Sequence, residues 1–567
     1  MMRDLFHGLS RSVFRVPCSV FFIAIIATSL NAQPSCPLPT TPQTCTDGAF
    51  GNATPAPFDA LNANEVDSIV RTAAASLTVD TMTVAVVDRA GRVLALFRKP
   101  SADPANDDVA VGVARTAAFF SHNMAPLSSR TVRFISGIHF PPGITDTPSA
   151  ALYGIENTNR GCDFNVVFNT DKCFPRARSL NGNPCDSSDT SGCGPGIVTG
   201  KILPDDRDAS SVNAGGVPLY RIVDASRIDE GIISNGKLIG GIGVAGVPGD
   251  PQLAEFAAAT GAFAGVAPVP SFPLPNPGNV FIDGIRLPFL GPDIKLTFNG
   301  SGLPIGVERP EDTAGVTALN GTFVIAAKNG GCAPNEYLAG PSGGSSLTQS
   351  DVDGIVQRAI ATAKKTRGAI RLPLNSYARM VIAVADTDGS ILALYRMPDA
   401  TVFSIDVAIA KARNVIYFSQ TGLQGVPAGT AISNRTIAFG SQPFFPPGID
   451  SRVFDVGPGP FYNSLFLFDL ANPCSQGTQA KNANQNGVVF FAGSTPLYRG
   501  NTLVGGLGIS GDGIEQDDYV SYFGAGPFLP ATKMWADRIK IDGARLPMFK
   551  FPRQPGGVKE CGGKPCG

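Results

Sequence analysis

The sequence predicts an α+β protein built from two tandem domains, each a mainly antiparallel sheet packed by helices. The first observation is an internal repeat: TVAVVDRAGRVLALFRKP, which starts at Thr83, returns as VIAVADTDGSILALYRMP, which starts at Val381. The second is length, because 567 residues exceed what one hydrophobic core usually organises. The third is that helical and strand patterns follow one another in the same order in both copies. A repeat this long indicates a duplicated domain, since solenoid units recur about every 20 to 50 residues.

Each copy begins with an amphipathic helix, followed by a β-hairpin. The helices are predicted over 64–77 and 350–365, and Thr348 or Ser350 is suited to cap the second one. The hairpin strands are predicted over 82–87 with 92–98, and their equivalents start at Val381. Asp and Gly at the turn supply the side-chain hydrogen bonds and positive φ that a tight turn requires.

A second helix, a second hairpin and a last helix complete each copy. The second helices are predicted over 107–121 and 404–419, because apolar residues recur on one face. The remaining elements of the two copies are predicted over 217–222, 237–244 and 251–261, and over 495–499, 502–509 and 514–523. The Pro- and Gly-rich stretch between the copies reads as a connection, with 295–298 and 322–327 as candidate extra strands.

These patterns divide the chain into five parts. They are a signal peptide (1–32), a first domain (60–290), a linker (291–346), a second domain (347–550) and a Cys-containing tail (551–567). The N-terminal part carries arginines, a short apolar run over 20–27 and small residues near Ala32, the pattern of a secretory signal. We therefore expect an exported protein, periplasmic or extracellular, without stable membrane insertion after cleavage. A formal net charge of −1 gives no electrostatic reason to expect nucleic acid as a partner.

The cysteines agree with export. Eleven are present, and loss of Cys18 with the leader leaves an even number, which favours disulfides in an exported chain. Four of them lie close together in a polar insertion that has no counterpart of similar length in the second copy: Cys162, Cys173, Cys185 and Cys193. We interpret this insertion as a disulfide-stapled loop, because it lacks the compact Cys and His pairs of a zinc site.

Recurring basic residues are the candidate ligand-binding groups. Arg98 and Arg396 end the second strand of each copy, and Arg115 and Arg413 lie on the following helix. Since a guanidinium donates two parallel hydrogen bonds to a carboxylate, these side chains are suited to grip a small carboxylate or a propionate. An internal Arg–Asp pair that holds helix to sheet is the structural alternative. Further candidates are Arg435, Arg499 and Lys411, of which Lys411 has no basic equivalent in the first copy.

The motifs resemble a known family. IAVADTDGSILALYRMPDA, SIDVAIAKARNVIYFS and PLYRGNTLVGGLGISGDG, all in the second copy, are similar to the GlcG/HbpS family of small haem-binding proteins. The first copy departs where Val113 stands for Lys411 and Lys99 for Met397. The resemblance implies a profilin-like sheet packed by helices, self-association or an internal pseudo-dimer, and a small-molecule ligand such as haem or another tetrapyrrole.

Other motifs are weaker. GGIGVAG at Gly240 and GGLGISG at Gly505 contain G-x-G-x-x-G, but they run along a strand instead of opening a helix, so we interpret them as sites of close backbone approach. His139 is the candidate axial ligand for a haem iron, since histidine is scarce and has no equivalent in the second copy. No nucleophile elbow, zinc-protease or phosphate-loop motif is present, and no catalytic residue is assigned.

Three functions remain open at this stage. The leading hypothesis is an exported tandem-domain binding protein for haem, a related tetrapyrrole or a small carboxylate. The alternatives are a haem-degrading or small-metabolite enzyme of the same family, and a structural or interaction protein whose pockets are vestigial.

Overall fold

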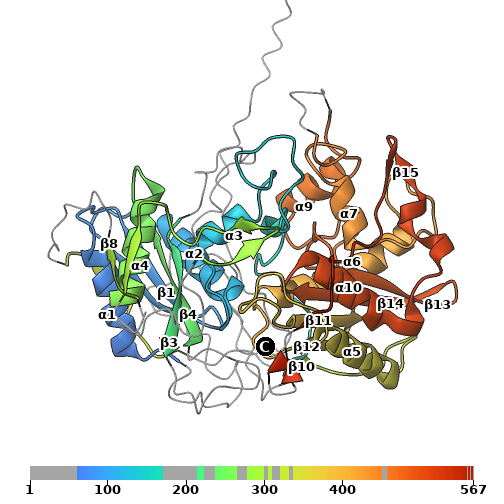
Figure 1. Cartoon of the computed structure of the whole chain (residues 1–567), viewed down its shortest axis with the longest axis horizontal. Helices are drawn as coiled ribbons and strands as arrows, with labels where there is room; N and C mark the ends of the chain where they lie inside the picture. The colour runs from blue at the N-terminus through green and yellow to red at the C-terminus, as the bar shows by residue number, and fades with distance from the viewer. Residues whose placement is uncertain are drawn as a thin grey trace, which may run out of the picture.

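The computed structural model describes two domains that lie side by side (Figure 1). The described residues are 60–169, 214–222, 236–264, 278–298, 304–308, 319–330, 336–449, 456–558, 560–561 and 564–565. The predicted signal peptide and Cys173, Cys185 and Cys193 lie outside these ranges. Among the described residues no helix has the length and apolarity needed to cross a bilayer.

The two domains have the same topology, as the repeat predicts. The first sheet has the order β3-β4-β1-β2-β9 and the second the order β13-β14-β11-β12-β10, with antiparallel pairing throughout. The strands of the first sheet are β1 (Thr83–Asp88), β2 (Val93–Arg98), β3 (Gly216–Ile222), β4 (Gly236–Ala245) and β9 (Thr322–Ile325). Those of the second are β10 (Glu336–Ala339), β11 (Met380–Ala385), β12 (Ile391–Arg396), β13 (Ser494–Arg499) and β14 (Thr502–Gly511).

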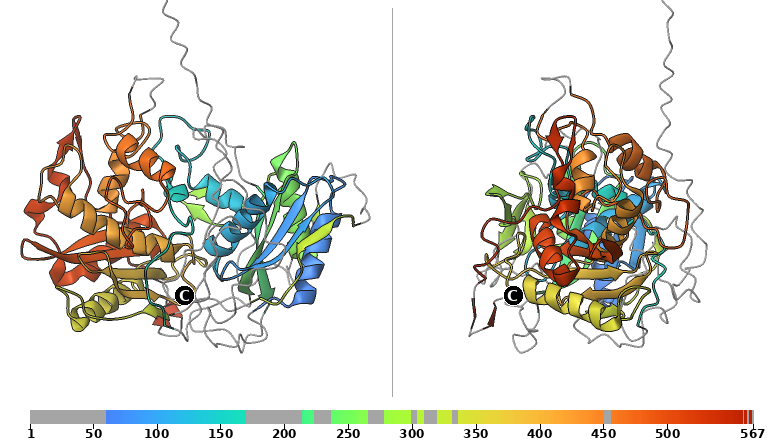
Figure 2. Two further views of the ribbon diagram at one scale, coloured as in Figure 1. Left: turned by 180° about the vertical axis from the view of Figure 1, so that it is seen from behind. Right: turned by 90° about the vertical axis from the view of Figure 1, so that its right-hand side faces the viewer.

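Helices cover both faces of each sheet. In the first domain α2 (Asn106–Phe120) packs on one face, and α1 (Ala63–Ala75) with α4 (Pro251–Ala264) on the other. In the second domain α6 (Ser404–Thr421) takes the place of α2, and α5 (Gln349–Ala363) with α10 (Ile514–Ala525) covers the opposite face, as the views in Figure 2 show. β1 and β11 are therefore buried along their whole length. The predicted α+β class is confirmed.

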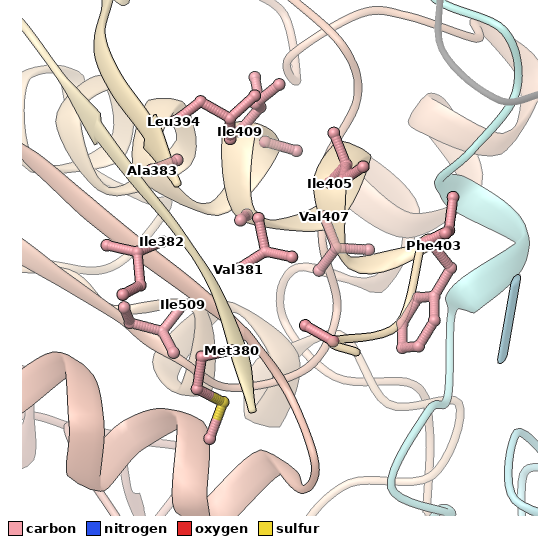
Figure 3. Close-up of a cluster of buried hydrophobic side chains, with 14 of the residues drawn as sticks. Met380, Val381, Ile382, Ala383, Leu394, Phe403, Ile405, Val407, Ile409 and Ile509 are labelled. Atoms are coloured by element: carbon pink, nitrogen blue, oxygen red, sulfur yellow. The ribbon is translucent and has the colours of Figure 1, made fainter. Parts of the chain in front are cut away.

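Side chains of the central strands and helices form the core of the second domain. Figure 3 shows β11 residues such as Val381 near Ile405 and Ile409 of α6, with Ile509 of β14 beside Ile382. The N-cap of α5 is Thr348, whose side chain accepts a hydrogen bond from the backbone N–H of Asp351, as the sequence predicts.

Glycines let the central helix lie directly on the sheet. A Cβ on Gly241 or Gly243 of β4 would clash with a carbonyl oxygen of α2. Gly506 and Gly508 of β14 meet α6 in the same way. The G-x-G spacing is thus explained by close approach of a helix, which agrees with the interpretation from sequence.

The segment 291–346, expected as a linker, contributes to both sheets. It holds β7 (Lys295–Phe298), which pairs with β8 (Pro304–Glu308), and β9, which pairs with β2. β10, which the sequence pattern does not indicate, pairs with β12. The connection therefore adds an edge strand to each domain. The candidate strands at 295–298 and 322–327 are confirmed as β7 and β9, whereas β10, with 4 residues, is too short to give a clear periodic pattern.

Short elements complete each copy. They are α3 (Ser129–Phe134) and α7 (Asn434–Gly440), the hairpins β5 (Phe281–Ile282) with β6 (Ile285–Arg286) and β15 (Lys540–Ile541) with β16 (Ala544–Arg545), the π-helix η4 (Tyr462–Leu467), α9 (Phe468–Ala471), and β17 (Glu560–Cys561) with β18 (Lys564–Pro565).

Equivalent residues of the two copies contact each other between the domains. His139 and Phe444 precede the two Pro-Pro-Gly turns by the same distance in sequence, and their rings stack with centroids 5.7 Å apart. Arg160 of the first domain also forms a largely buried ion pair of 2.7 Å with Asp469 of the second. A contact between equivalent positions, such as that of His139 with Phe444, is typical of a two-fold interface.

The two-fold relation between the domains is only approximate. Phe120 stacks on Phe403 with a centroid distance of 4.0 Å, and the apolar core continues through this contact from one domain to the other. Phe418, the equivalent of Phe120, packs instead in a separate cluster with Tyr498. This second cluster also crosses the interface, since Tyr153 of the first domain stacks on Phe466 within it.

A disulfide also joins the domains. Cys162 bonds Cys474, with their Cα atoms 5.4 Å apart. From the sequence, Cys162 is predicted to lie in a loop that is stapled by disulfides within itself. Its partner instead comes from the second domain, because the chain around Cys162 runs against α9.

Candidate ligand-binding sites

The two strand-end arginines have different partners. Arg98 grips Asp107 with two parallel hydrogen bonds, the Nε–Oδ1 distance being 2.8 Å. Arg396 is 3% exposed and donates to the carbonyl oxygen of Ala400. Burial, then the charge of nearby Arg89, lowers the pKa of Arg396 to about 9. Arg98 therefore holds helix α2 to the sheet, whereas Arg396 lies among other buried arginines.

The helix arginines hold the hairpin turns. Arg115 Nε donates to the carbonyl oxygen of Gly91 at 2.8 Å, and Arg413 Nε to that of Gly389 at 2.9 Å. Arg413 also donates to Asn486 Oδ1 and to the carbonyl oxygen of Phe164 in the first domain. All three donor nitrogens of Arg413 are thus engaged by protein oxygen atoms.

Lys411 forms a buried pair that the first domain lacks. Its Nζ lies 3.0 Å from Asp517 Oδ2 and 2.7 Å from the carbonyl oxygen of Ile509, with the Lys411 side chain fully buried. Burial raises the pKa of Asp517 to about 7, against the opposing effect of Lys411. The equivalent positions are Val113 and Ala254, so both members of the pair are replaced together.

The next helix in each domain is tied down by a second buried pair. Arg435 pairs with Asp518, and its equivalent Arg130 grips Glu255 with distances of 2.7 and 2.8 Å. Asp518 also accepts from the backbone N–H of Lys550, as Glu255 does from Gly291. These equivalent bonds fix the chain after β6 and after β16 in the same place.

Arg499 and His139 lie apart from the other candidates. Arg499 is on the surface, where Nη2 is 3.2 Å from Asp351 Oδ2. His139 is buried in the domain interface, and its Nδ1 lies 3.2 Å from the carbonyl oxygen of Thr147. Within the described ranges no group of three or more His, Cys, Asp or Glu side chains is placed to hold a metal ion.

A cavity of about 750 Å³ opens in the first domain beside the β5–β6 hairpin. Its walls combine Arg130 and Arg286 with apolar groups such as Phe134, Phe289 and Leu290. Arg286 is exposed, and its Nε donates to the carbonyl oxygen of Gly278 at 2.6 Å. The volume is in the range of small-molecule sites, which are mostly apolar with a few polar groups. None of the lining residues is His, Met, Cys or Tyr.

The comparison with protein families agrees with the repeat. The family described as "Haem degrading protein HbpS-like" matches residues 58–166 and 347–525, just over half of the chain and once in each domain. The chain belongs to this family. The resemblance predicted from the sequence is confirmed for both copies.

Other comparisons add little to the HbpS-like assignment. No protein among those with curated descriptions matches. A solved structure titled "Crystal Structure of PduOC:Heme Complex" is 21% identical, with 32% of this chain and 95% of that chain covered and a TM-score of 0.22. The Klebsiella pneumoniae protein ORFY is 19% identical, with 31% and 87% covered and a TM-score of 0.19. Because both TM-scores are low, we base no conclusion on these two structures.

The second HbpS-like domain carries bulkier side chains where the first has its cavity. Leu290 and Pro292 of the first domain correspond to Phe549 and Phe551, which follow the same DG-x-RLP motif. Phe549 and Phe551 belong to an aromatic cluster with Tyr519, Tyr522, Phe523 and Trp535. The two domains therefore differ at this place although the motif is shared.

Most residues of one buried group, the buried arginine cluster, are not among the candidates predicted from the sequence. We use this name for six ionisable groups whose side chains are at most a few per cent exposed: Arg89, Arg371, Arg379, Arg396, Asp399 and Asp512. Arg371 and Arg379 lie in a segment before β11 that the first copy lacks. The available signal was the density of basic residues in KKTRGAIRLPLNSYAR, a stretch expected only to connect two elements.

Arg371 forms ion pairs with both carboxylates of the cluster. Its Nε and Nη2 lie 2.7 and 3.3 Å from the two oxygens of Asp512, and its Nη1 lies 2.6 Å from Asp399 Oδ2. Asp399 also accepts from the backbone N–H of Asn123 in the first domain. Burial raises its pKa, but Arg371, His122, Arg379 and this bond together lower it to about 2. The cluster thus contributes to the contact between the domains.

Proposed function

We propose that this chain is a binding protein for haem or a related tetrapyrrole, and that the cavity beside the β5–β6 hairpin receives the ligand. The observation that carries the proposal is a cavity of about 750 Å³ whose walls combine apolar side chains with two guanidinium groups. A tetrapyrrole is a flat apolar ring that carries carboxylate side chains, so both kinds of lining have a counterpart in it. Membership of the HbpS-like family supports the same ligand class.

The residues present fit the ring and its carboxylates. Arg286 is the principal carboxylate partner, because no acidic side chain pairs with it among the described residues. Arg130 already grips Glu255 and contributes positive charge at the cavity wall. Phe134, Phe289 and Leu290 would contact the ring faces. A haem would bring a redox-active iron, for which the cavity wall offers no axial ligand, and His139 is not part of that wall.

The proposal includes an exported protein whose two domains act as an internal pseudo-dimer. The N-terminal arginines and apolar run support export, as does the disulfide between Cys162 and Cys474. The contact between the equivalent residues His139 and Phe444 supports the pseudo-dimer. N-terminal sequencing of the secreted protein should start near residue 33, and a mature chain that still carries the leader would contradict export.

The test of ligand binding is a titration of the full chain with haemin. The absorbance near the Soret band should change in a saturable way, and Arg286→Ala should weaken binding by about tenfold, the loss of one charge-assisted hydrogen bond. The matched control is Arg545→Ala, which removes the equivalent arginine of the second domain and should leave the affinity unchanged. Equal effects of the two variants would exclude the cavity as the site.

A structural or interaction protein is the second candidate. The observation that favours it is the engagement of Arg98, Arg413, Arg435 and Lys411 by protein oxygen atoms. If haemin and its iron-free porphyrin produce no saturable change with the wild-type chain, this candidate replaces the binding protein.

A further inference from the structure

Another cavity, of about 200 Å³, lies in the second domain beside the turn between β11 and β12. Its walls come from this turn, from the last turns of α6 and from the loop that connects α9 to β13. Five side chains in these walls are amides: Gln420, Gln476, Gln479, Asn482 and Asn484. Gln420 and Asn482 are exposed, so the cavity reaches the surface. A ligand therefore has both room and access.

The charges of the cavity wall cancel. Asp388 and Arg413 are the only ionised residues that line it. The carboxylate oxygens of Asp388 accept hydrogen bonds from the backbone N–H and the hydroxyl of Ser390, both at 2.8 Å. All three nitrogens of Arg413 donate to protein oxygen atoms, among them the carbonyl oxygen of Gly389. Because an ionic ligand would lose its water without gaining a charged partner, the wall favours a neutral ligand.

Several polar groups that line the cavity have hydrogen-bonding capacity to spare. Gln479 Oε1 accepts from Gln476 and Gln485, at 3.3 and 2.9 Å, whereas its NH2 group has no acceptor among the described residues. Gln420 uses its NH2 group on a backbone carbonyl oxygen at 3.3 Å, and its Oε1 has no donor in the same part of the chain. Amides and hydroxyl groups each donate and accept hydrogen bonds. The complementary ligand therefore carries several hydroxyl groups.

One part of the wall is apolar. It is formed by Ile416 and Tyr417, and the ring of Tyr417 packs edge to face on Phe418 with centroids 4.9 Å apart. A sugar ring has a C–H face that packs on an aromatic ring and hydroxyl groups around its edge, so both kinds of wall have a counterpart in it. The cavity volume equals that of roughly seven water molecules, at about 30 Å³ each. This is room for a single sugar ring but not for a tetrapyrrole.

The polar wall is held in place by bonds within the protein. Asn484 donates to the carbonyl oxygen of Asp388 at 2.9 Å and accepts from Asn165 of the first domain at 2.7 Å. The loop before β13 is thereby tied to the hairpin turn and to the first domain. Groups that are oriented before the ligand arrives lower the entropic cost of binding.

The first domain has different residues at the equivalent positions. Tyr417 and Gln420 correspond to Phe119 and His122, whose side chains are fully buried. Asp388 corresponds to Ala90, which is also buried. The combination of amides and an accessible aromatic ring at this turn therefore belongs to the second domain.

We propose that this cavity binds one neutral monosaccharide in its pyranose form. The amide groups bind the hydroxyl groups of the sugar, and Tyr417 packs on the C–H face of its ring. The site is separate from the tetrapyrrole cavity of the first domain and takes a different class of ligand.

Saturation-transfer difference NMR of the full chain tests the proposal, with glucose, galactose, mannose and N-acetylglucosamine as probes. The ring protons of at least one sugar should receive saturation from the protein, with a saturable dose response. Gln479→Glu keeps the two hydrogen bonds that Gln479 accepts but removes its NH2 group, and should weaken binding about fivefold. Tyr417→Leu removes the aromatic ring and should weaken binding about threefold to tenfold. Gln357→Glu, which changes an exposed amide of α5 outside the cavity, is the matched control and should leave the affinity unchanged.

Four results would overturn the proposal. One is the absence of a saturable signal from all four sugars, and another is an equal effect of Gln479→Glu and Gln357→Glu. An equal signal from glycerol at the same concentration would show uptake of any polyol instead of a sugar ring. Glucuronate should bind at least about fivefold more weakly than the best of the four sugars, and equal binding would contradict a neutral ligand. Haemin should not displace the sugar, so a failure of haemin binding would affect only the cavity of the first domain.

Discussion

Replacing Lys411 by Val alone should destabilise the second domain by about 3 to 5 kcal/mol, because it leaves a buried carboxylate without its cation. The ammonium and carboxylate lie 3.0 Å apart, which corresponds to an attraction of about 5 kcal/mol at an effective dielectric constant of about 20. Asp517 Oδ1 already has no partner, so the carboxylate has little else to stabilise it. Asp517→Ala alone should cost a similar amount, since Lys411 would keep only the carbonyl oxygen of Ile509.

The double variant K411V/D517A should be more stable than either single variant. It copies Val113 and Ala254 of the first domain, and its remaining cost is the space left by smaller side chains, about 1 to 2 kcal/mol. Chemical denaturation of the four proteins gives a double-mutant cycle with an expected coupling of at least about 2 kcal/mol. The exposed pair of Arg499 and Asp351 is the control, with a coupling of at most about 1 kcal/mol. Additive effects at Lys411 and Asp517 would refute the reasoning.

Three further substitutions test other parts of the structure. Burial raises the pKa of Asp406 to about 7, so this group favours the folded chain at low pH and loses that contribution as pH rises through 7. Asp406→Asn should therefore raise the free energy of unfolding at pH 8 by a few kcal/mol at most and flatten its pH profile. An unchanged pH profile would contradict the burial argument. Replacing Cys162 and Cys474 by Ala should lower stability by about 2 to 4 kcal/mol in denaturation under oxidising conditions, whereas reduced wild type should match the variant. Gly508→Ala should cost about 1 to 3 kcal/mol, because the added Cβ meets the carbonyl oxygen of Ala408, and a neutral result would show that α6 can move away from the sheet.

The repeated architecture could be predicted because it rests on local patterns that occur twice. The Asp-x-x-Gly turns, the apolar stripe of α6 and the cap at Thr348 each determine structure within a few residues. The edge strands β9 and β10 depend on pairing with distant partners, so short runs near Thr322 and Tyr337 give only a weak signal.

The candidate sites were harder to predict because a basic residue has the same sequence signal whether it binds a ligand or a neighbour. Arg98 and Arg413 recur in both copies, yet their recurrence reflects the bonds that hold helix and turn in place. Arg286 was not singled out, although its DG-x-RLP motif recurs, because the cavity forms only when the hairpin packs beside α3.

The most direct measurement of the central claim is the stoichiometry of haemin binding to the full chain. The cavity walls of the first domain are replaced in the second by bulkier residues such as Phe549 and Phe551, although Arg545 is retained. We therefore predict one equivalent of haemin per chain, with weaker binding in Arg286→Ala and unchanged binding in Arg545→Ala. Two equivalents per chain, or one equivalent lost in Arg545→Ala but kept in Arg286→Ala, would contradict the account.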